Sequence, residues 1–418
     1  MDTHELANHW HLPEKIPPHV RICSHPIFII GSPRSGTTIL AWSLAQHSQL
    51  WTSDESQILW DLFGDGRLDK NYQRAERLDG SWLRKQGIEK AEFLRFLGLG
   101  LNALFTSRSQ AKRWIDQTPA YTLIADDLID MFPGAFFIHI LRDGRAVVHS
   151  MINYLDRFRD LTKANTSKGV FPPWTVDFRE ACRTWNRYVK ASLDFCARHP
   201  KRCLTVVNEK LVADPSQSFR EILRFIHVPH EDSPADFFRS NRINSSFPTE
   251  TLKPPGLPRV WEPWKAWNTE QQKTCLEEAG HTLCRTIACT VLPPGATVLV
   301  VSKGDEELLE LGGRRAWHFP RGKGGTYAGY HPGASSEAID HLEELRASGG
   351  EFLIFPSTAF WWLDYYGEFR HHLDTHYRRI QSDDYCIIFQ LTSPEPGEPG
   401  CQQRRQKALA ASGLAPLP

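Results

Sequence analysis

The stretch Pro26-Ile27-Phe28-Ile29-Ile30-Gly31-Ser32-Pro33-Arg34-Ser35-Gly36-Thr37-Thr38 decides the fold of this chain. Its first half is an apolar run typical of a buried strand, and the apolar residues after Thr38 follow a helical spacing. A glycine-bounded loop between a strand and a helix directs backbone N–H groups and a helix N-terminus at one point, where they can bind an anion. The sequence therefore predicts a phosphate-binding loop over residues 31–38.

This loop differs from the usual nucleotide-binding loop in its cation. The spacing Gly31-x4-Gly36 is that of a P-loop, but Thr37 stands where a lysine normally follows the second glycine. Arg34 supplies a positive charge from inside the loop instead, and arginine suits bidentate recognition of an oxyanion. The loop therefore favours a donor with a phosphate-like group that is bound without the usual lysine of nucleotide triphosphate sites.

A second candidate site follows the apolar run 135–141, which predicts a strand buried on both faces. Arg142 comes directly after this strand, at the sheet edge where open α/β folds bind ligands. Ser150 lies eight residues later, about two turns along a helix expected near 145–155. Arg142 and Ser150 can therefore hold one phosphate group from two sides.

Together the two motifs resemble the donor-binding signatures of sulfotransferases that use 3′-phosphoadenosine 5′-phosphosulfate (PAPS), and the resemblance covers about residues 26–285. It implies that Arg142 and Ser150 bind the 3′-phosphate and that Arg34 is the catalytic cation near the bridging oxygen. It implies that the 5′-phosphosulfate is held by Arg34, Ser35, Gly36, Thr37 and Thr38. Less specific matches place Trp185 at the adenine, on which a tryptophan can stack, and Lys265 at a further phosphate contact.

The resemblance also suggests a general base, which transfer to a hydroxyl requires. Glu55 matches the glutamate that carbohydrate and protein-tyrosine sulfotransferases place shortly after the loop helix. Asp54 is its neighbour and a second candidate. The cytosolic small-molecule branch uses a histidine instead, and His139 and His149 are the candidates of that type. No metal is implied, because a transferring sulfuryl group carries less charge than a phosphoryl group.

The segment Asp116-Gln117-Thr118-Pro119-Ala120-Tyr121 resembles the Glu-Lys-Thr-Pro-Ala-Tyr segment of heparan-type sulfotransferases, which lines the acceptor side. Glutamine replaces lysine here, so the likeness does not imply a polyanionic glycan. We expect a small-molecule or glycan acceptor, with a carbohydrate or glycoconjugate hydroxyl favoured.

Strand and helix patterns alternate along the chain, which predicts an α/β fold with a P-loop-like parallel sheet flanked by helices. Helices are expected near 88–106, 121–132 and 177–198 and, after residue 295, over 305–311 and 358–378. Pro293-Pro294-Gly295 marks a boundary before a small C-terminal α/β domain. We expect a lead-in over 1–25, a sulfotransferase domain over 26–292, an accessory domain over 296–393 and a disordered tail over 394–418. The aromatic run 355–366 resembles a small domain of unknown role attached to bacterial glycosyltransferases, which implies a bacterial source.

Composition excludes several classes of protein. Lys plus Arg and Asp plus Glu both number 49, so no global positive field favours nucleic acid. The apolar runs are far shorter than a membrane span. The nine cysteines are scattered without a CxxC pair, which predicts reduced thiols in a cytoplasmic protein and no metal site.

Two alternatives remain. A P-loop nucleotide kinase or NTPase would need a lysine at position 37 and Mg²⁺-dependent ATP binding. A non-catalytic binding protein with a vestigial donor site would leave the C-terminal domain as the working part, although both donor motifs are intact.

Overall fold

The computed structural model describes residues 21–77, 80–157, 171–241 and 263–392 of the 418-residue chain. The chain divides into two units, Met1–Thr286 and Ile287–Pro418, and each is described by itself. The division falls within helix α15 (Thr269–Val291), shortly before the boundary expected at 292. The expected tail over 394–418 and most of the lead-in lie outside the described residues.

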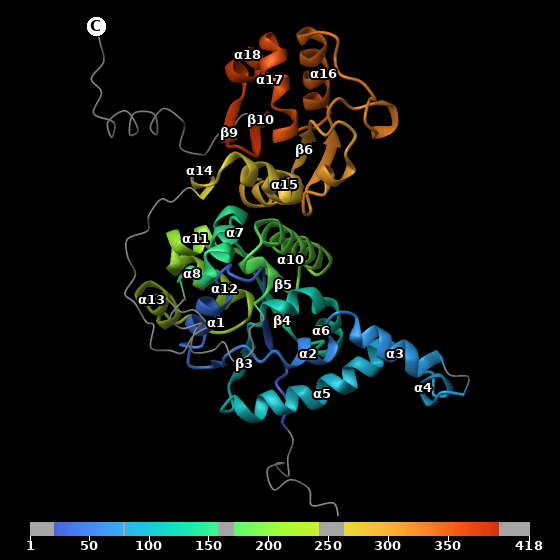
Figure 1. Ribbon diagram of the computed structural model, residues 1–418, viewed down its shortest axis with the longest axis vertical. Coiled ribbons are helices and arrows are strands. Elements are labelled where there is room, and N and C mark those ends of the chain that lie inside the picture. Colours follow the sequence, from blue (N-terminus) through green and yellow to red (C-terminus); the bar gives the residue numbers. More distant parts are fainter. Residues whose placement is uncertain (1–20, 78–79, 158–170, 242–262, 393–418) are drawn as a thin grey trace, which may run out of the picture. The chain divides into compact units, whose positions relative to one another are not determined.

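The first unit is built on a five-stranded parallel sheet with the strand order β2-β3-β1-β4-β5. Figure 1 labels three of these strands, β3, β4 and β5. Its strands are β1 (Ile27–Ile30), β2 (Leu50–Thr52), β3 (Arg113–Asp116), β4 (Phe136–Leu141) and β5 (Cys203–Val207). The predicted parallel sheet is confirmed. β2 and β3 were not predicted, because β2 is only three residues long and β3 has a charged residue at each end.

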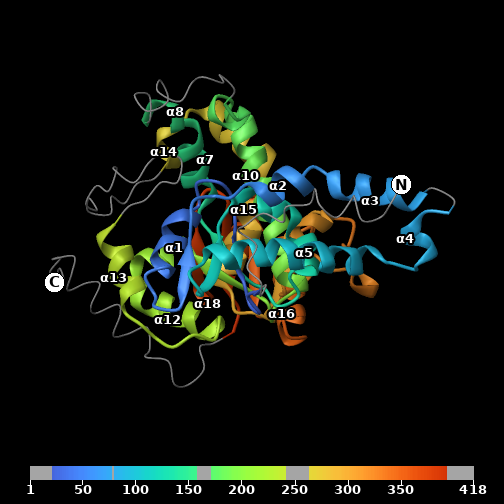
Figure 2. The same ribbon diagram turned by 90° about the horizontal axis from the view of Figure 1, so that it is seen from below.

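Alternation along β1 divides the core of this unit into two faces. Ile27 and Ile29 pack into a cluster with the helices α1 (Thr37–Leu44), α12 (Pro215–Phe225) and α13 (Ser233–Ser240). Phe28 and Ile30 pack into a cluster with α5 (Lys90–Arg108), α6 (Ala125–Met131) and α10 (Phe178–Arg198). Figures 1 and 2 show α1, α12 and α13 gathered on one side of the sheet. Because every residue of β1 is fully buried, this strand is the centre of the unit.

The helices of the first unit follow the predicted order. The expected helices near 88–106 and 177–198 are α5 and α10, while the one over 121–132 begins as a 3-10 turn. The helical elements besides α15 are α1 (Thr37–Leu44), α2 (Ile58–Phe63), α3 (Arg67–Arg77), α4 (Trp82–Lys85), α5 (Lys90–Arg108), η1 (Pro119–Ile124), α6 (Ala125–Met131), α7 (Gly144–Ile152), α8 (Tyr154–Arg157), η3 (Pro173–Thr175), α10 (Phe178–Arg198), α11 (Asn208–Ala213), α12 (Pro215–Phe225), α13 (Ser233–Ser240) and α14 (Pro263–Ala266). Within the described ranges no helix is long and apolar enough to cross a membrane.

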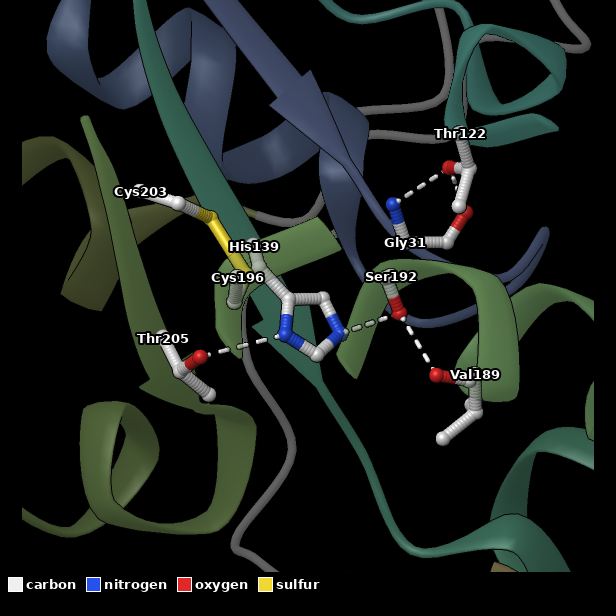
Figure 3. The surroundings of a disulfide bond; sticks show 8 residues. All are labelled: Gly31, Thr122, His139, Val189, Ser192, Cys196, Cys203 and Thr205. Atoms are coloured by element: carbon white, nitrogen blue, oxygen red, sulfur yellow. Dashed lines mark hydrogen bonds between the residues drawn. A yellow bond between two sulfur atoms is a disulfide. The ribbon is translucent and has the colours of Figure 1, made fainter. Parts of the chain in front are cut away.

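A disulfide links the end of α10 to the start of β5 (Figure 3). Cys196 and Cys203 are joined, with their Cα atoms 5.2 Å apart. The expectation that all cysteines are reduced is therefore wrong at this pair. The sequence did not indicate this disulfide, because the two cysteines are seven residues apart and only the turn between α10 and β5 brings them together.

The second unit contains a five-stranded mixed sheet with the order β7-β6-β8-β10-β9. β6 pairs in parallel with β7 and β8, whereas β10 pairs antiparallel with β8 and β9. Its elements are β6 (Thr297–Val300), η5 (Glu306–Leu309), β7 (Arg315–His318), η6 (Lys323–Gly325), α16 (Ser335–Ala347), β8 (Phe352–Pro356), η7 (Ser357–Ala359), α17 (Trp361–Tyr365), α18 (Gly367–His376), β9 (Arg378–Ser382) and β10 (Cys386–Gln390). The α/β prediction holds here too.

Two helix predictions in the second unit are wrong. The single helix expected over 358–378 is two helices that meet at Tyr366, and its last residue belongs to β9. The side chain of Tyr366 turns into the core and donates to the carbonyl oxygen of Pro332 at 2.6 Å, which fixes the break. The helix expected over 305–311 is the short 3-10 turn η5.

Candidate functional site

The candidate site lies at the carboxyl ends of the parallel strands of the first unit. β1 has β3 on one side and β4 on the other, so the loop after β1 leaves the sheet at the point where the strand order reverses. Open α/β sheets bind ligands at this point. The loops after β2, β3, β4 and β5 reach the same edge, so residues far apart in the sequence meet there.

The loop 31–36 is shaped by its two glycines. Gly36 has φ of 103° and caps α1, and a Cβ atom there would lie 3.0 Å from the side-chain nitrogen of Asn208. At Gly31 a Cβ atom would lie 2.7 Å from the carbonyl oxygen of Ile140. The hydroxyl of Thr122 accepts from the Gly31 N–H at 2.8 Å and donates to the Gly31 carbonyl oxygen at 3.0 Å. Glycine is therefore required at both ends of the loop.

The structure brings Arg34, Arg142 and Ser150 together. Arg34 Nε donates to Ser150 Oγ at 3.3 Å, and Arg142 Nη1 donates to the carbonyl oxygen of Arg34 at 2.9 Å. The Arg34 guanidinium also lies 5.2 Å from the centre of the Tyr154 ring. Two guanidinium groups and a hydroxyl thus meet beside the N-terminus of α1, where anionic groups such as phosphate or sulfate would be bound by charge-assisted hydrogen bonds.

The residues that follow Arg142 fix the start of α7. Asp143 caps the helix by accepting from the Arg145 N–H at 2.9 Å, and its carboxylate also binds the Arg145 side chain. Of the two arginines in Arg142-Asp143-Gly144-Arg145, Arg145 is therefore engaged by Asp143, whereas Arg142 turns to the loop. At Gly144 a Cβ atom would lie 2.6 Å from the Trp185 ring.

Gln117 places an amide next to α1. Its Oε1 accepts from Thr38 Oγ1 at 3.2 Å, and the side chain is 1% exposed. Its Nε2 atom is buried without a hydrogen-bond partner in the described part of the chain. A buried donor without a partner is costly, and an anionic ligand at the loop would satisfy it. Sequence reasoning treated Gln117 only as a replaced lysine and did not place it at the site.

The segment that carries Glu55 is held in place by its neighbour Ser56. Ser56 Oγ donates to Asp116 Oδ2 at 2.6 Å and lies 2.7 Å from the Tyr121 hydroxyl. Glu55 is half-buried and accepts from Gln57 Nε2 at 2.9 Å, whereas Asp54 is exposed. Burial raises the pKa of Asp116, and its hydrogen bond with Ser56 positions the segment that carries Glu55. The segment 116–121 thus supports the loop that carries the proposed base.

The two histidine candidates differ in their surroundings. His139 is fully buried in β4, where its two ring nitrogens contact Thr205 Oγ1 at 3.2 Å and Ser192 Oγ at 2.9 Å (Figure 3). Burial lowers its pKa to about 3, so the ring is neutral and structural. His149 is half-buried on α7, where its Nε2 lies 3.0 Å from Asn153 Nδ2.

Trp185 is buried against the start of α7, whereas Lys265 is exposed on a helix that contacts α7. Trp185 is 1% exposed and packs beneath Gly144, so in this structure its ring supports the start of α7, and its contact with adenine stays a prediction. Lys265 is exposed on α14, a helix that contacts α7. Arg259 and Trp261, in the proline-broken segment before it, lie outside the described residues.

Sequence reasoning missed two supports of the loop. Asn208 follows β5 directly and donates from Nδ2 to the Ser35 carbonyl oxygen at 3.2 Å. Tyr154 lies under the Arg34 guanidinium. The position of Asn208 after a predicted strand was a usable signal, but nothing in the sequence marked Tyr154. In the described ranges no three His, Cys, Asp or Glu side chains are grouped to hold a metal ion.

Half of the chain is similar in sequence to known proteins. A family model described as the sulfotransferase family matches residues 26–232. A protein-tyrosine sulfotransferase of Drosophila melanogaster is 28% identical over 209 residues, which are 50% of this chain and 39% of that protein. Protein-tyrosine sulfotransferase 1 of Danio rerio is 28% identical over 208 residues, 50% of this chain and 54% of that protein.

The chain thus spans about half the length or less of these two curated relatives. Among solved structures, a mouse sulfotransferase in complex with 3′-phosphoadenosine 5′-phosphate (PAP) is similar at 14% identity and a TM-score of 0.35. The similarity covers 63% of this chain and 84% of the mouse chain. Through residues 26–232, the chain belongs to the sulfotransferase family.

Proposed function

We propose that the first unit transfers the sulfuryl group of PAPS to an acceptor hydroxyl and releases PAP. The observation that carries this proposal is the meeting of Arg34, Arg142 and Ser150 at the end of β1. The family to which residues 26–232 belong supports it.

The residues present fit a donor with two separate anionic groups. The loop and the N-terminus of α1 would bind the 5′-phosphosulfate, and Arg142 with Ser150 would bind the 3′-phosphate. The buried Gln117 Nε2 supplies a further donor beside Thr38. ATP has no 3′-phosphate, and Thr37 stands where a kinase or NTPase has its lysine. The donor set therefore favours PAPS over ATP.

The proposed reaction is an in-line displacement at sulfur. The acceptor oxygen forms a bond to sulfur as the bond from sulfur to the bridging oxygen breaks, and PAP leaves with that electron pair. Glu55 takes the acceptor proton, and Arg34 and the loop N–H groups stabilise the charge that develops on the leaving oxygen. Ser56, bonded to Asp116 and Tyr121, holds the segment that presents Glu55 to the acceptor.

A carbohydrate hydroxyl is the acceptor that the sequence favours. A tyrosine hydroxyl of a peptide is a second candidate, because the relatives from Drosophila melanogaster and Danio rerio are named protein-tyrosine sulfotransferases. Both acceptors present a hydroxyl from which a glutamate can take the proton.

Calorimetry with PAP and with ATP, each with and without Mg²⁺, tests the donor. We expect metal-independent binding of PAP that is at least tenfold tighter than that of ATP, since one charge-assisted phosphate contact is worth about that factor. A preference for ATP with Mg²⁺ would instead support the kinase or NTPase alternative. Transfer of labelled sulfate from PAPS to an oligosaccharide panel and to a tyrosine peptide panel then separates the two acceptors. PAP binding without transfer to any acceptor would favour the non-catalytic alternative.

A further inference from the structure

The second unit has a sheet edge with the same topology as the site in the first unit. β6 lies between β7 and β8, and all three strands run parallel. The loops after their carboxyl ends are residues 301–305, 319–331 and 357–360, and together with Trp361 at the start of α17 they are called the β6 edge here. This is the place where open parallel sheets bind ligands.

The loops of the β6 edge are fastened to one another. Ser302 Oγ lies 2.6 Å from His318 Nδ1, and Lys303 Nζ donates to the carbonyl oxygen of Thr358 at 2.6 Å. At Gly304 a Cβ atom would lie 3.1 Å from the Tyr327 ring. These contacts join all three loops, so the edge is an ordered arrangement of side chains.

Ser302 and His318 do not form a hydrolytic pair, although Glu306 lies 3.1 Å from the second ring nitrogen of His318. Ser302 and His318 are each 2% exposed, and Ser302 Oγ also accepts from the Gly304 N–H at 3.3 Å. A nucleophile must reach its substrate, and Ser302 does not. The pair therefore fastens the ends of two strands.

Arg321 is the residue that points to a ligand. Its guanidinium lies 4.2 Å from the centre of the Trp317 ring, and its Nε atom is buried. Among the described residues its side chain has no hydrogen-bond or ion-pair partner. A half-buried guanidinium without a counter-charge costs stability. An anionic ligand would remove that cost.

The neighbouring glycines leave space beside this guanidinium. At Gly325, which has φ of 90°, a Cβ atom would lie 3.0 Å from Arg321 Nη2. A side chain there would occupy the position from which an anion can reach the guanidinium donors. Gly324 also has a positive φ of 81°, so the loop takes a path that favours glycine.

A second cation and an exposed aromatic ring lie at the same edge. Lys303 is exposed, forms no ion pair in the described part of the chain, and has its Nζ 5.4 Å from the centre of the Trp361 ring. Trp361 is 36% exposed and lies 5.2 Å from the His331 ring. Exposed aromatic rings beside cations suit a ring-shaped ligand that carries an oxyanion.

We propose that the β6 edge binds a sugar that carries a phosphate or sulfate ester, with Arg321 and Lys303 binding the ester oxyanion and Trp361 contacting the ring. The two esters share their tetrahedral oxyanion, and the experiment separates them. The proposal stands on the second unit alone and does not depend on the activity proposed for the first.

Calorimetry on the full chain tests the proposal with glucose 6-phosphate, glucose 6-sulfate and glucose as probes. We expect at least one ester to bind at least tenfold more tightly than glucose, and the tighter ester identifies the source. Arg321→Met, which keeps an apolar side chain over Trp317, is expected to lower ester affinity at least tenfold. Because it removes an unpaired charge, it should leave the unfolding temperature of the ligand-free protein unchanged or higher.

Three further variants locate the bound ester within the chain. Lys303→Ala should lower ester affinity, with at most a small fall in the unfolding temperature from loss of the exposed bond to Thr358. Arg378→Ala removes an exposed cation from β9, away from the β6 edge, and should leave ester affinity unchanged. Arg34→Ala should also leave it unchanged, since Arg34 belongs to the first unit. Ester binding that survives Arg321→Met but is lost in Arg34→Ala would place the probes in the first unit and overturn the proposal. So would equal affinity for glucose and both esters, or a lower unfolding temperature in Arg321→Met.

Discussion

Two sheet edges in this protein have the same topology and different chemistry. At the end of β1, Arg34 and Arg142 are held by protein atoms, one by the Ser150 hydroxyl and the other by the loop backbone. At the β6 edge, the Arg321 guanidinium lies against the Trp317 ring and has no hydrogen-bond or ion-pair partner among the described residues. Fixing cations before the ligand arrives lowers the ordering cost of binding and is what transition-state stabilisation requires. The difference suggests that the first edge is built for chemistry and the second for binding.

The strongest test of that contrast is Glu55→Gln. If the first edge is catalytic, this change should lower the rate of sulfuryl transfer by about 10²- to 10⁴-fold, the usual contribution of a general base. PAP affinity should stay the same, because the proposed contact of Glu55 is with the acceptor hydroxyl and not with the phosphates. Single-turnover transfer from PAPS and calorimetry with PAP measure the two quantities. Asp54→Asn is the matched control and should transfer at the wild-type rate; normal turnover by Glu55→Gln would remove the base assignment.

Arg142→Ala tests the donor side of the same edge. Loss of a charge-assisted contact of about 1.5–3 kcal/mol should weaken PAP binding roughly 10- to 100-fold. Affinity for adenosine 5′-phosphosulfate, which lacks the 3′-phosphate, should change much less. Arg145→Ala is a control from the same motif, since Asp143 already binds that side chain. Wild-type PAP affinity in Arg142→Ala would contradict the 3′-phosphate assignment.

Gly144→Ala tests whether the first edge depends on a rigid support. The added methyl group would meet the Trp185 ring at 2.6 Å, and such overpacking costs typically about 1–3 kcal/mol of unfolding free energy. Urea unfolding measures it. Gly100→Ala in α5 is the control, because nothing lies within 4 Å of its added Cβ and alanine is the better helix former by about 1 kcal/mol. If the two variants were equally stable, the Trp185 ring would have moved to accommodate the added methyl group, and the start of α7 would not depend on a rigid support.

Gln117→Leu should have a smaller effect, confined to ligand binding. It removes the unpartnered Nε2 donor, so PAP or PAPS affinity should fall about tenfold. The unfolding temperature without ligand should change little, because a buried donor without a partner is removed together with the Thr38 contact. Gln117→Glu places a negative charge at the anion site and should weaken binding further. Donor affinity unchanged by both variants would exclude Gln117 from the site.

The pH dependence of stability probes the core beneath the first edge. The folded-state pKa of His139 is about 3, below its ordinary value of 6.5. Between these values only the unfolded chain binds the proton, so stability should fall as pH drops from 6.5 towards 3, by up to about 1.4 kcal/mol per pH unit. His139→Asn keeps a polar group but does not titrate, and its unfolding free energy should fall less steeply over this window. Parallel pH profiles for the two proteins would contradict a neutral buried His139.

Sequence reasoning found the elements of the fold whose own residues form a clear pattern. The run before Gly31 and the run before Arg142 predicted β1 and β4, and the loop spacing predicted the anion-binding edge. β2, β3 and β9 were missed, because short or polar strands become strands only when neighbours pair with them. The break at Tyr366 was missed for the same reason, since it depends on burial of one ring.

The candidate site was predictable to a similar extent. Arg34, Arg142 and Ser150 were identified from motifs, and the structure brings them together. Gln117 Nε2, Tyr154 and the anchoring role of Ser56 were not found, because each depends on which side chains meet across the sheet edge. Motifs identify groups that carry charge, whereas contacts across the edge determine which groups support them.

The anchoring of Ser56 by Asp116 and Tyr121 has an evolutionary consequence. The segment that carries Glu55 is bonded to β3 and η1 through Ser56, Gln57 and Leu59. The donor loop is bonded to Thr122, Asn208 and Arg142. Exposed residues after Ser56, such as Asp61 and Leu62, take no part in either set of contacts and can therefore be exchanged without disturbing the donor loop. One donor site can in this way acquire new acceptors by replacement of exposed residues beside it, and a library varied at Asp61 and Leu62 would reveal how far that exchange can go.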